Sequence, residues 1–278
     1  MHTNSIRDNL TKDNIISDIK LTLSADFKKE KTFIIVEGQD DTKFFRSKIS
    51  ANTEIKESFS GKVGVDEIVD SLNDDRVIGI KDRDFDKLSD SNRIFYYDFS
   101  CMEIMLIFND DTFKSLTGEF YTGTERFDVL RYYIARELLI LTCIRKVCAE
   151  AGVGINFKGL SLDNCDKKAR LHKPSIFAEL KKINNINKFW QSLLIINRAI
   201  GLYRQMKLDN MFVEMTQGHD FLKYFCIVCN RTLQRHCNVD IVSSALRCAF
   251  QDKDFIITRL YSDVKIYESN NNLKFLCM

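Results

Sequence analysis

The chain has a single proline, Pro174, in 278 residues, and it has no long apolar run. No apolar run approaches the roughly 18 residues that a membrane-spanning helix needs. The first eight residues also have no apolar core of the kind found in signal peptides. We therefore expect a cytoplasmic protein that does not enter a membrane. A Gly-x-x-x-x-Gly-Lys-Ser/Thr loop is absent too, so any ATP hydrolysis would belong to a partner chain.

The nine cysteines do not form the pattern of a disulfide framework, because their number is odd and their spacing is scattered. Cys226 and Cys229, with His236 and Cys237 nearby, resemble a zinc cluster at first sight. The gaps do not match paired zinc knuckles, and the segment has a helical pattern. We interpret these cysteines as small core residues.

Charge is unevenly distributed, although the net charge is only +2. Residues 1–110 hold 16 Lys/Arg and 22 Asp/Glu, which gives a net charge of −6. Residues 111–278 hold the other 41 − 16 = 25 basic and 39 − 22 = 17 acidic residues, which gives a net charge of +8. This asymmetry is compatible with a metal site in an acidic half and a polyanion-binding surface in a basic half. Charge also varies between the halves of unrelated proteins, so this observation needs support from motifs.

The first part of the chain alternates between strand and helix patterns. Strands are expected at Thr32–Val36, near Ile55–Phe59, at Val77–Ile80 and at Ile94–Tyr97. Helices are expected within residues 10–30, from Asp40 or Asp41 to about Ile49, at Val65–Leu72 and at Met102–Phe108. This alternation predicts an α/β fold with a mostly parallel sheet flanked by helices.

The second part has long helical patterns. They cover Phe127–Ala149, Ser175–Ile183, Phe189–Met206, Asp220–Gln234 and Ile241–Phe250. We therefore expect an α/β catalytic domain over residues 1–110. An α-helical C-terminal half, residues 111–278, is expected to bind substrate and to form oligomer or partner contacts.

Carboxylates follow the expected strands, and ligands bind at the carboxyl ends of strands in such sheets. Glu37 and Gly38 follow the first strand, and Asp82 and Asp84 follow the third. If the backbone stays extended, Asp82 and Asp84 leave it on the same side. Paired carboxylates suit Mg²⁺ or Mn²⁺, and Glu37 would be a further ligand or a general acid/base. An Asp after a strand is common in turns, so the prediction depends on the whole set.

Other acids near this set have two interpretations each. Asp41 is either a metal ligand or the cap of its own helix. Glu103 is either a ligand or part of a capping box with Ser100. Asp86 and Asp98 are better explained as turn residues.

Several basic residues are candidates for phosphate binding. Lys43 and Lys81 border the acidic set but are also explained as solvated charges. His219, at the start of a helical pattern, would contact phosphate or protonate a leaving group, or else be a turn residue. The densest basic run contains Lys167, Lys168 and Arg170, and it is either a nucleic-acid contact or a solvated loop.

The motifs resemble those of a known family. Val36-Glu37-Gly38-Gln39-Asp40-Asp41, Val77-Ile78-Gly79-Ile80-Lys81-Asp82-Arg83-Asp84 and Cys101-Met102-Glu103 are similar to the motifs of a TOPRIM domain. The OLD-like TOPRIM group is the most similar, and within it the TOPRIM effector nucleases of PARIS anti-phage defence systems. The motifs cover residues 32–108. The third one lacks a clean Asp-x-x-x-Glu pattern, so the role of Glu103 stays open.

This resemblance implies a metal-dependent endonuclease with Glu37, Asp82 and Asp84 as catalytic residues. The metal would be Mg²⁺ or Mn²⁺, bound by these three with Asp41 and Glu103. The substrate would be nucleic acid, with tRNA favoured over DNA. Activation would follow release from an ABC-type ATPase sensor subunit, and the active form would be a homodimer. The alternative is a non-catalytic TOPRIM-like binding or sensor subunit of an ATPase complex.

Overall fold

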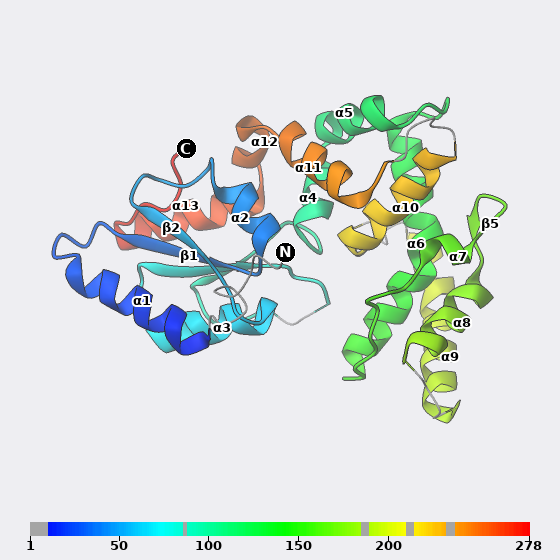
Figure 1. Ribbon diagram of the computed structural model, residues 1–278, viewed down its shortest axis with the longest axis horizontal. Coiled ribbons are helices and arrows are strands. Elements are labelled where there is room, and N and C mark those ends of the chain that lie inside the picture. The colour runs from blue at the N-terminus through cyan, green and yellow to red at the C-terminus, as the bar shows by residue number, and fades with distance from the viewer. Residues whose placement is uncertain (1–10, 86–87, 185–188, 210–213, 232–236) are drawn as a thin grey trace, which may run out of the picture. The chain divides into compact units, whose positions relative to one another are not determined.

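The computed structural model describes residues 11–85, 88–184, 189–209, 214–231 and 237–278 (Figure 1). It has a mixed α/β architecture, with a four-stranded parallel sheet, helices against the sheet, and a C-terminal half made largely of helices. The fold class expected from the sequence is confirmed. Asp86 and His236 lie outside the described residues.

The sheet has the strand order β2-β1-β3-β4, and every neighbouring pair is parallel. The strands are β1 (Thr32–Val36), β2 (Thr53–Glu57), β3 (Val77–Lys81) and β4 (Ile94–Tyr96). Every residue of β1 and β3 is buried, as expected for central strands covered on both faces. The two central strands are therefore the ones that carry Glu37 and Asp82 at their ends.

Two helices cover one face of the sheet. Hydrophobic residues of α1 (Lys12–Ala25) and α3 (Gly61–Leu72) form one cluster with residues of β1, β3 and β4. Gly79, in the middle of β3, allows this close packing. A Cβ at Gly79 would lie 2.6 Å from Val65 Cγ1 and 2.7 Å from Ile94 Cδ1.

Aromatic side chains form a second cluster, contributed by α2 (Gln39–Phe45) and by segments far along the chain. Phe44 and Phe45 of α2 contact Tyr97, which follows β4, and Phe255 of α12 (Asp252–Ile256). Tyr267 of α13 (Arg259–Asn271) packs edge-on against Phe95 of β4. The last residues of the chain thus belong to the core of the sheet domain.

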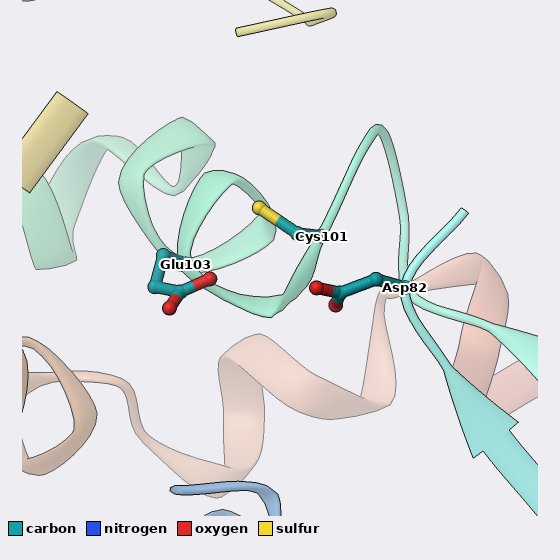
Figure 2. A group of neighbouring side chains, drawn as sticks. All are labelled: Asp82, Cys101 and Glu103. Atoms are coloured by element: carbon teal, nitrogen blue, oxygen red, sulfur yellow. The ribbon is translucent and has the colours of Figure 1, made fainter. Parts of the chain in front are cut away.

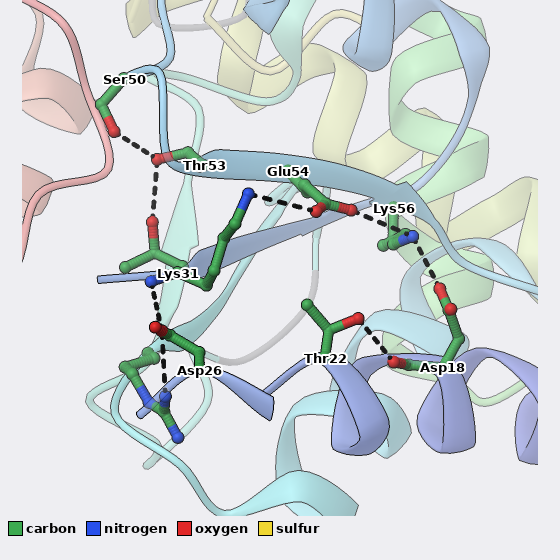
Figure 3. Close-up of polar contacts among 10 residues, drawn as sticks. Asp18, Thr22, Asp26, Lys31, Ser50, Thr53, Glu54 and Lys56 are labelled. Carbon is green, nitrogen blue, oxygen red and sulfur yellow. Dashed lines mark hydrogen bonds and ion pairs between the residues drawn. The ribbon is translucent and has the colours of Figure 1, made fainter. Parts of the chain in front are cut away.

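Polar contacts at the amino ends of β1 and β2 hold this last segment in place. The hydroxyl groups of Thr32, Ser50 and Thr53 are linked by 2.8 Å hydrogen bonds through Thr53. The Thr53 and Ser50 hydroxyls also donate to the carbonyl of Lys274. Figure 3 shows this chain of hydroxyls beside a series of ion pairs from Lys31 through Glu54 and Lys56 to Asp18.

The chain divides into two compact units. The sheet unit comprises residues 1–83, 87–102 and 251–278, and the helical unit comprises residues 84–86 and 103–250. The division falls within α4 (Met102–Phe108). It differs from the expected boundary at residue 110 mainly because residues 251–278 pack with the sheet.

The helical unit confirms the five helices expected from periodicity, to within a few residues at their ends. The structure adds α5 (Asp110–Phe120), the short α7 (Leu162–Cys165) and a two-stranded hairpin of β5 (Asp166–Lys167) and β6 (Arg170–Leu171), which the sequence patterns did not predict. The five expected helices of this unit are α6 (Phe127–Glu150), α8 (Lys173–Asn184), α9 (Phe189–Asp209), α10 (Gly218–Asn230) and α11 (Val239–Ala249).

Gly79→Ala should destabilise the sheet unit. The added methyl group meets Val65 and Ile94 at distances that force side chains or backbone to shift, at a cost of about 1–3 kcal/mol. Urea unfolding of the purified protein measures this loss. Gly118→Ala is the matched control, because Gly118 is exposed on α5 with nothing within 4 Å of the added Cβ. An unchanged unfolding midpoint for Gly79→Ala would contradict this close packing of β3 against α3 and β4.

Candidate metal centre

Strand register brings the carboxyl ends of β1, β3 and β4 to one edge of the sheet. Val36 pairs with Ile80, and Lys81 pairs with Tyr96. The residues that follow are Glu37, Asp82 and Tyr97. The backbone N–H of Asp82 donates a 2.7 Å hydrogen bond to Glu37 Oε1, so the Glu37 carboxylate is fixed directly beside the start of the Asp82 loop.

Asp41 lies one helical turn beyond Glu37, and both of its carboxylate oxygens accept hydrogen bonds. Gly38 N donates to Oδ2 at 3.1 Å, and the Tyr97 hydroxyl donates to Oδ1 at 2.6 Å. The first contact shows that Asp41 does cap α2. Burial raises the pKa of the Asp41 carboxyl, and the hydrogen bonds from Tyr97 and Gly38 oppose that rise.

Tyr97 is the buried group around which the acids gather. Its side chain is 1% exposed. Burial raises the pKa of Tyr97 well above its ordinary value, and the negative charges of Asp41, Asp82 and Glu37 raise it further. Three carboxylates from two strand ends and one helix therefore act on a single hydroxyl group. The sequence patterns did not single out Tyr97, although its position at the end of an expected strand was a usable signal.

Asp82 also contacts the start of α4. The backbone N–H of Met102 donates to Asp82 Oδ1 at 3.2 Å. Asp82, Cys101 and Glu103 each place one donor atom within 4.8 Å of the others. Figure 2 shows the Asp82 and Glu103 carboxylates directed toward one another, with the Cys101 side chain between their backbones. Among the described residues, this is the group with the geometry of a metal ligand set.

The sequence predicted Cys101 as one of several core cysteines, and its position in this group was missed. It is fully buried, and the Ser100 hydroxyl donates to its sulfur at 3.7 Å. Cys101 directly precedes Met102, the first residue of α4. The signal available in the sequence was a Cys-x-Glu pair directly before an expected helix.

Asp84 does not have the extended backbone expected from the sequence. β3 ends at Lys81, and Asp84 lies in a turn with φ of 43°. Its Oδ1 atom is buried. The alternation that would place Asp82 and Asp84 on one side requires an extended backbone, so it does not apply here. Asp84 is not part of the group formed by Asp82, Cys101 and Glu103.

The two lysines expected to border the acids both have acidic partners. Lys81 is 5% exposed, and its Nζ lies 2.6 and 2.7 Å from the oxygens of Asp66 on α3. It is therefore not a solvated charge, and its ammonium is committed to Asp66. Lys43 is exposed and pairs with Asp40 at 3.3 Å. Neither position supports the expected contact with phosphate.

Asp98 has a structural role at the start of α13. Its two oxygens accept hydrogen bonds from the backbone N–H groups of Arg259 and Leu260, each at 2.9 Å. Carboxylates at helix N-termini are stabilising because they pair with N–H groups that have no partner inside the helix. The sequence predicted a turn residue at this position, and the structure gives Asp98 this capping role.

The other predicted substrate-binding residues lie in the helical unit. His219 is exposed near the start of α10, and partial desolvation followed by the charge of Lys223 lowers its pKa. Lys167, Lys168 and Arg170 are exposed on the β5–β6 hairpin. Cys226 and Cys229 of α10 are buried, and burial raises the pKa of both thiols, in agreement with their interpretation as core residues.

No protein-family profile matches this chain, and no curated protein matches it in sequence. The candidate centre is therefore defined by its own geometry. A buried tyrosine, two central strand ends and the start of α4 position Glu37, Asp41, Asp82, Cys101 and Glu103.

Tyr97→Phe should destabilise the sheet unit while preserving the aromatic packing. It removes the donor to the buried Asp41 Oδ1, at a cost of about 1–3 kcal/mol at pH 7. The hydrogen bond favours the ionised carboxyl, so the loss should shrink as pH falls through the raised pKa of Asp41. Urea unfolding at pH 7 and near pH 4 tests this. Equal stability of the two proteins at pH 7 would contradict it.

Proposed function

We propose that this chain is a metal-dependent nuclease that cleaves nucleic acid, with tRNA as the favoured substrate. The observation that carries the proposal is the placement of Glu37 and Asp82 together at the carboxyl ends of β1 and β3, where Glu37 Oε1 accepts the Asp82 N–H and the Tyr97 hydroxyl holds Asp41 beside them. Such an edge is where α/β sheets bind ligands. The resemblance of these motifs to TOPRIM nucleases supplies the reaction class and the preference for tRNA.

The donor atoms at this edge suit a divalent cation. Asp82 and Glu103 provide hard carboxylate oxygens within 4.8 Å of one another, and Glu37 is held beside Asp82. Oxygen donors favour Mg²⁺ or Mn²⁺. The sulfur of Cys101, in the same group, favours the softer of these two ions, Mn²⁺. When bound, the cation would stabilise negative charge on the phosphate and favour ionisation of a water molecule.

Glu37 is the residue placed to move a proton. Its Oε1 atom accepts the Asp82 N–H, which fixes the orientation of the carboxylate. The other oxygen, Oε2, lies 3.9 Å from the position that a Cβ on Gly61 would occupy. We assign to Oε2 the acceptance of a proton from the attacking water. Asp41 and Tyr97 act as positioning residues, since each uses its polar atoms to hold the other.

The proposal extends to partners and setting. We propose a toxic effector of an anti-phage defence system, regulated by an ABC-type ATPase subunit and active as a cytoplasmic homodimer. The lack of a phosphate-binding loop in the chain supports a separate ATPase. None of the described helices is both long enough and apolar enough to cross a membrane.

Glu37→Gln and Asp82→Asn should each reduce Mn²⁺-dependent cleavage of tRNA by about 100-fold or more, because each removes a charge needed for proton transfer or metal binding. Asp40→Asn is the matched control, since Asp40 is an exposed acid of α2 that pairs with Lys43. Single-turnover assays on gels measure the rates. Wild-type rates in Glu37→Gln would refute the assignment, and a wild-type protein that binds tRNA without cleaving it would favour a non-catalytic binding subunit.

Cys101→Ser should change the metal preference of the reaction. Replacing sulfur by oxygen makes the ligand set harder, so the ratio of Mn²⁺-supported to Mg²⁺-supported activity should fall by roughly tenfold. Metal titrations of both proteins under identical ionic strength give this ratio. A ratio equal to that of the wild-type protein would show that Cys101 does not contact the metal.

A further inference from the structure

The β5–β6 hairpin has a tight turn built from residues that do not favour it. Lys167 pairs with Arg170 across the two strands, so Lys168 and Ala169 form a two-residue turn. Their φ angles are 52° and 64°, both left-handed. Turns with two left-handed central residues favour Asn and Gly. A residue with a Cβ in this conformation costs about 1–2 kcal/mol, so the turn is strained at both positions.

Contacts on both sides hold the hairpin in this strained form. On one side, Leu171 N donates to Glu137 Oε2 of α6 at 2.9 Å, and the Tyr133 hydroxyl of the same helix donates to the Ala169 carbonyl. On the other side, Asp166 pairs with Arg231, the C-cap residue of α10, at 2.9 Å. Strained backbone persists where surrounding structure fixes it, and such places are commonly functional.

The charge on the hairpin adds a second cost. The directly paired Lys167 and Arg170 carry like charges, which is destabilising in an antiparallel pair. Lys168 at the turn adds a third positive charge. All three side chains are exposed, and within the described part of the chain none forms an ion pair. The cations are thus concentrated on a hairpin that is anchored to α6 and to Arg231, and among the described residues they have no ion-pair partners.

We propose that the β5–β6 hairpin is a phosphate-binding element that holds the backbone of RNA. A polyanion with closely spaced charges relieves the repulsion between Lys167 and Arg170 and gains from a support that is already ordered. The strained, anchored turn keeps the three cations within reach of neighbouring phosphates. This inference rests on the proposed function for the class of partner, because it names the surface that holds the nucleic-acid substrate.

Binding of fluorescein-labelled tRNA in EDTA, followed by anisotropy across a KCl series, tests the inference without any cleavage. The variant is Lys167→Glu/Lys168→Glu/Arg170→Glu. The matched control is Lys28→Glu/Lys29→Glu/Lys274→Glu, which reverses three exposed lysines that line one polar cavity in the sheet unit. Both variants change the net charge equally, so general electrostatic attraction falls by the same amount in each.

The hairpin variant should bind tRNA at least tenfold more weakly. The slope of log affinity against log salt concentration should become less negative by about 2, which is the change expected when three phosphate contacts to a single strand are lost. The cavity control should stay close to wild type. Equal weakening in both variants, an unchanged affinity in the hairpin variant, or no binding by the wild-type protein would each overturn the inference.

Two further measurements complete the test. The first distinguishes loss of the phosphate contacts from misfolding, and the second distinguishes RNA from a lipid surface as the partner. Lys167→Gln/Lys168→Gln/Arg170→Gln should also bind weakly, with a thermal midpoint equal to that of wild type, which excludes misfolding from charge reversal. Hairpin-dependent binding to phosphatidylserine vesicles in place of tRNA would overturn the choice of RNA. Binding is measured in EDTA and cleavage separately with Mn²⁺. A wild-type protein that binds through the hairpin in EDTA but cleaves nothing with Mn²⁺ would therefore refute the proposed function alone.

Discussion

The parallel pairing of β1 with β3 is the constraint on which the candidate centre depends. Its register matches Val36 with Ile80, so the two strands end together and Glu37 reaches the Asp82 backbone. The β3–β4 register then places Tyr97 beside Asp82. A slip of one residue would turn every side chain of a strand to the opposite face. The close packing of Val65 and Ile94 against Gly79 of β3 opposes such a slip, so the core of the sheet determines the position of the acids.

Gathering these acids costs electrostatic free energy, and hydrogen bonds within the structure oppose that cost. Backbone N–H groups of Gly38, Asp82 and Met102 each donate to one of the carboxylates, and Tyr97 donates to Asp41. The nearby Lys81 ammonium is hydrogen-bonded to Asp66 of α3. The divalent cation that we propose for this site would oppose the same repulsion. Burial is the main cause of the raised pKa values of Asp41 and Tyr97, and at Tyr97 the charges of Asp41, Asp82 and Glu37 add to the rise.

Local patterns in the sequence were sufficient to predict the sheet and most helices. The runs Thr32–Val36 and Val77–Lys81 are continuous apolar segments ended by acids, and they became the buried central strands. Three features depended on contacts between distant residues and were not predictable in this way. Asp98 caps a helix because Arg259, far along the chain, starts α13 next to it. Lys81 is buried with Asp66 of α3 as its ion-pair partner. Cys101 lies close to Asp82 only when β3 and α4 are in place. The left-handed turn at Asp84 was also not predictable, because the Asp-x-Asp pattern does not distinguish a turn from an extended strand end.

The central claim is that the acids at the ends of β1 and β3 bind a divalent cation. Isothermal titration calorimetry with Mn²⁺ on the metal-free wild-type protein and on a Glu37→Gln/Asp82→Asn double variant tests it directly, independently of any substrate. We predict saturable, stoichiometric binding to the wild-type protein and its loss in the double variant, with the fold of both confirmed by circular dichroism. Stoichiometric Mn²⁺ binding of equal affinity in the two proteins would contradict the claim.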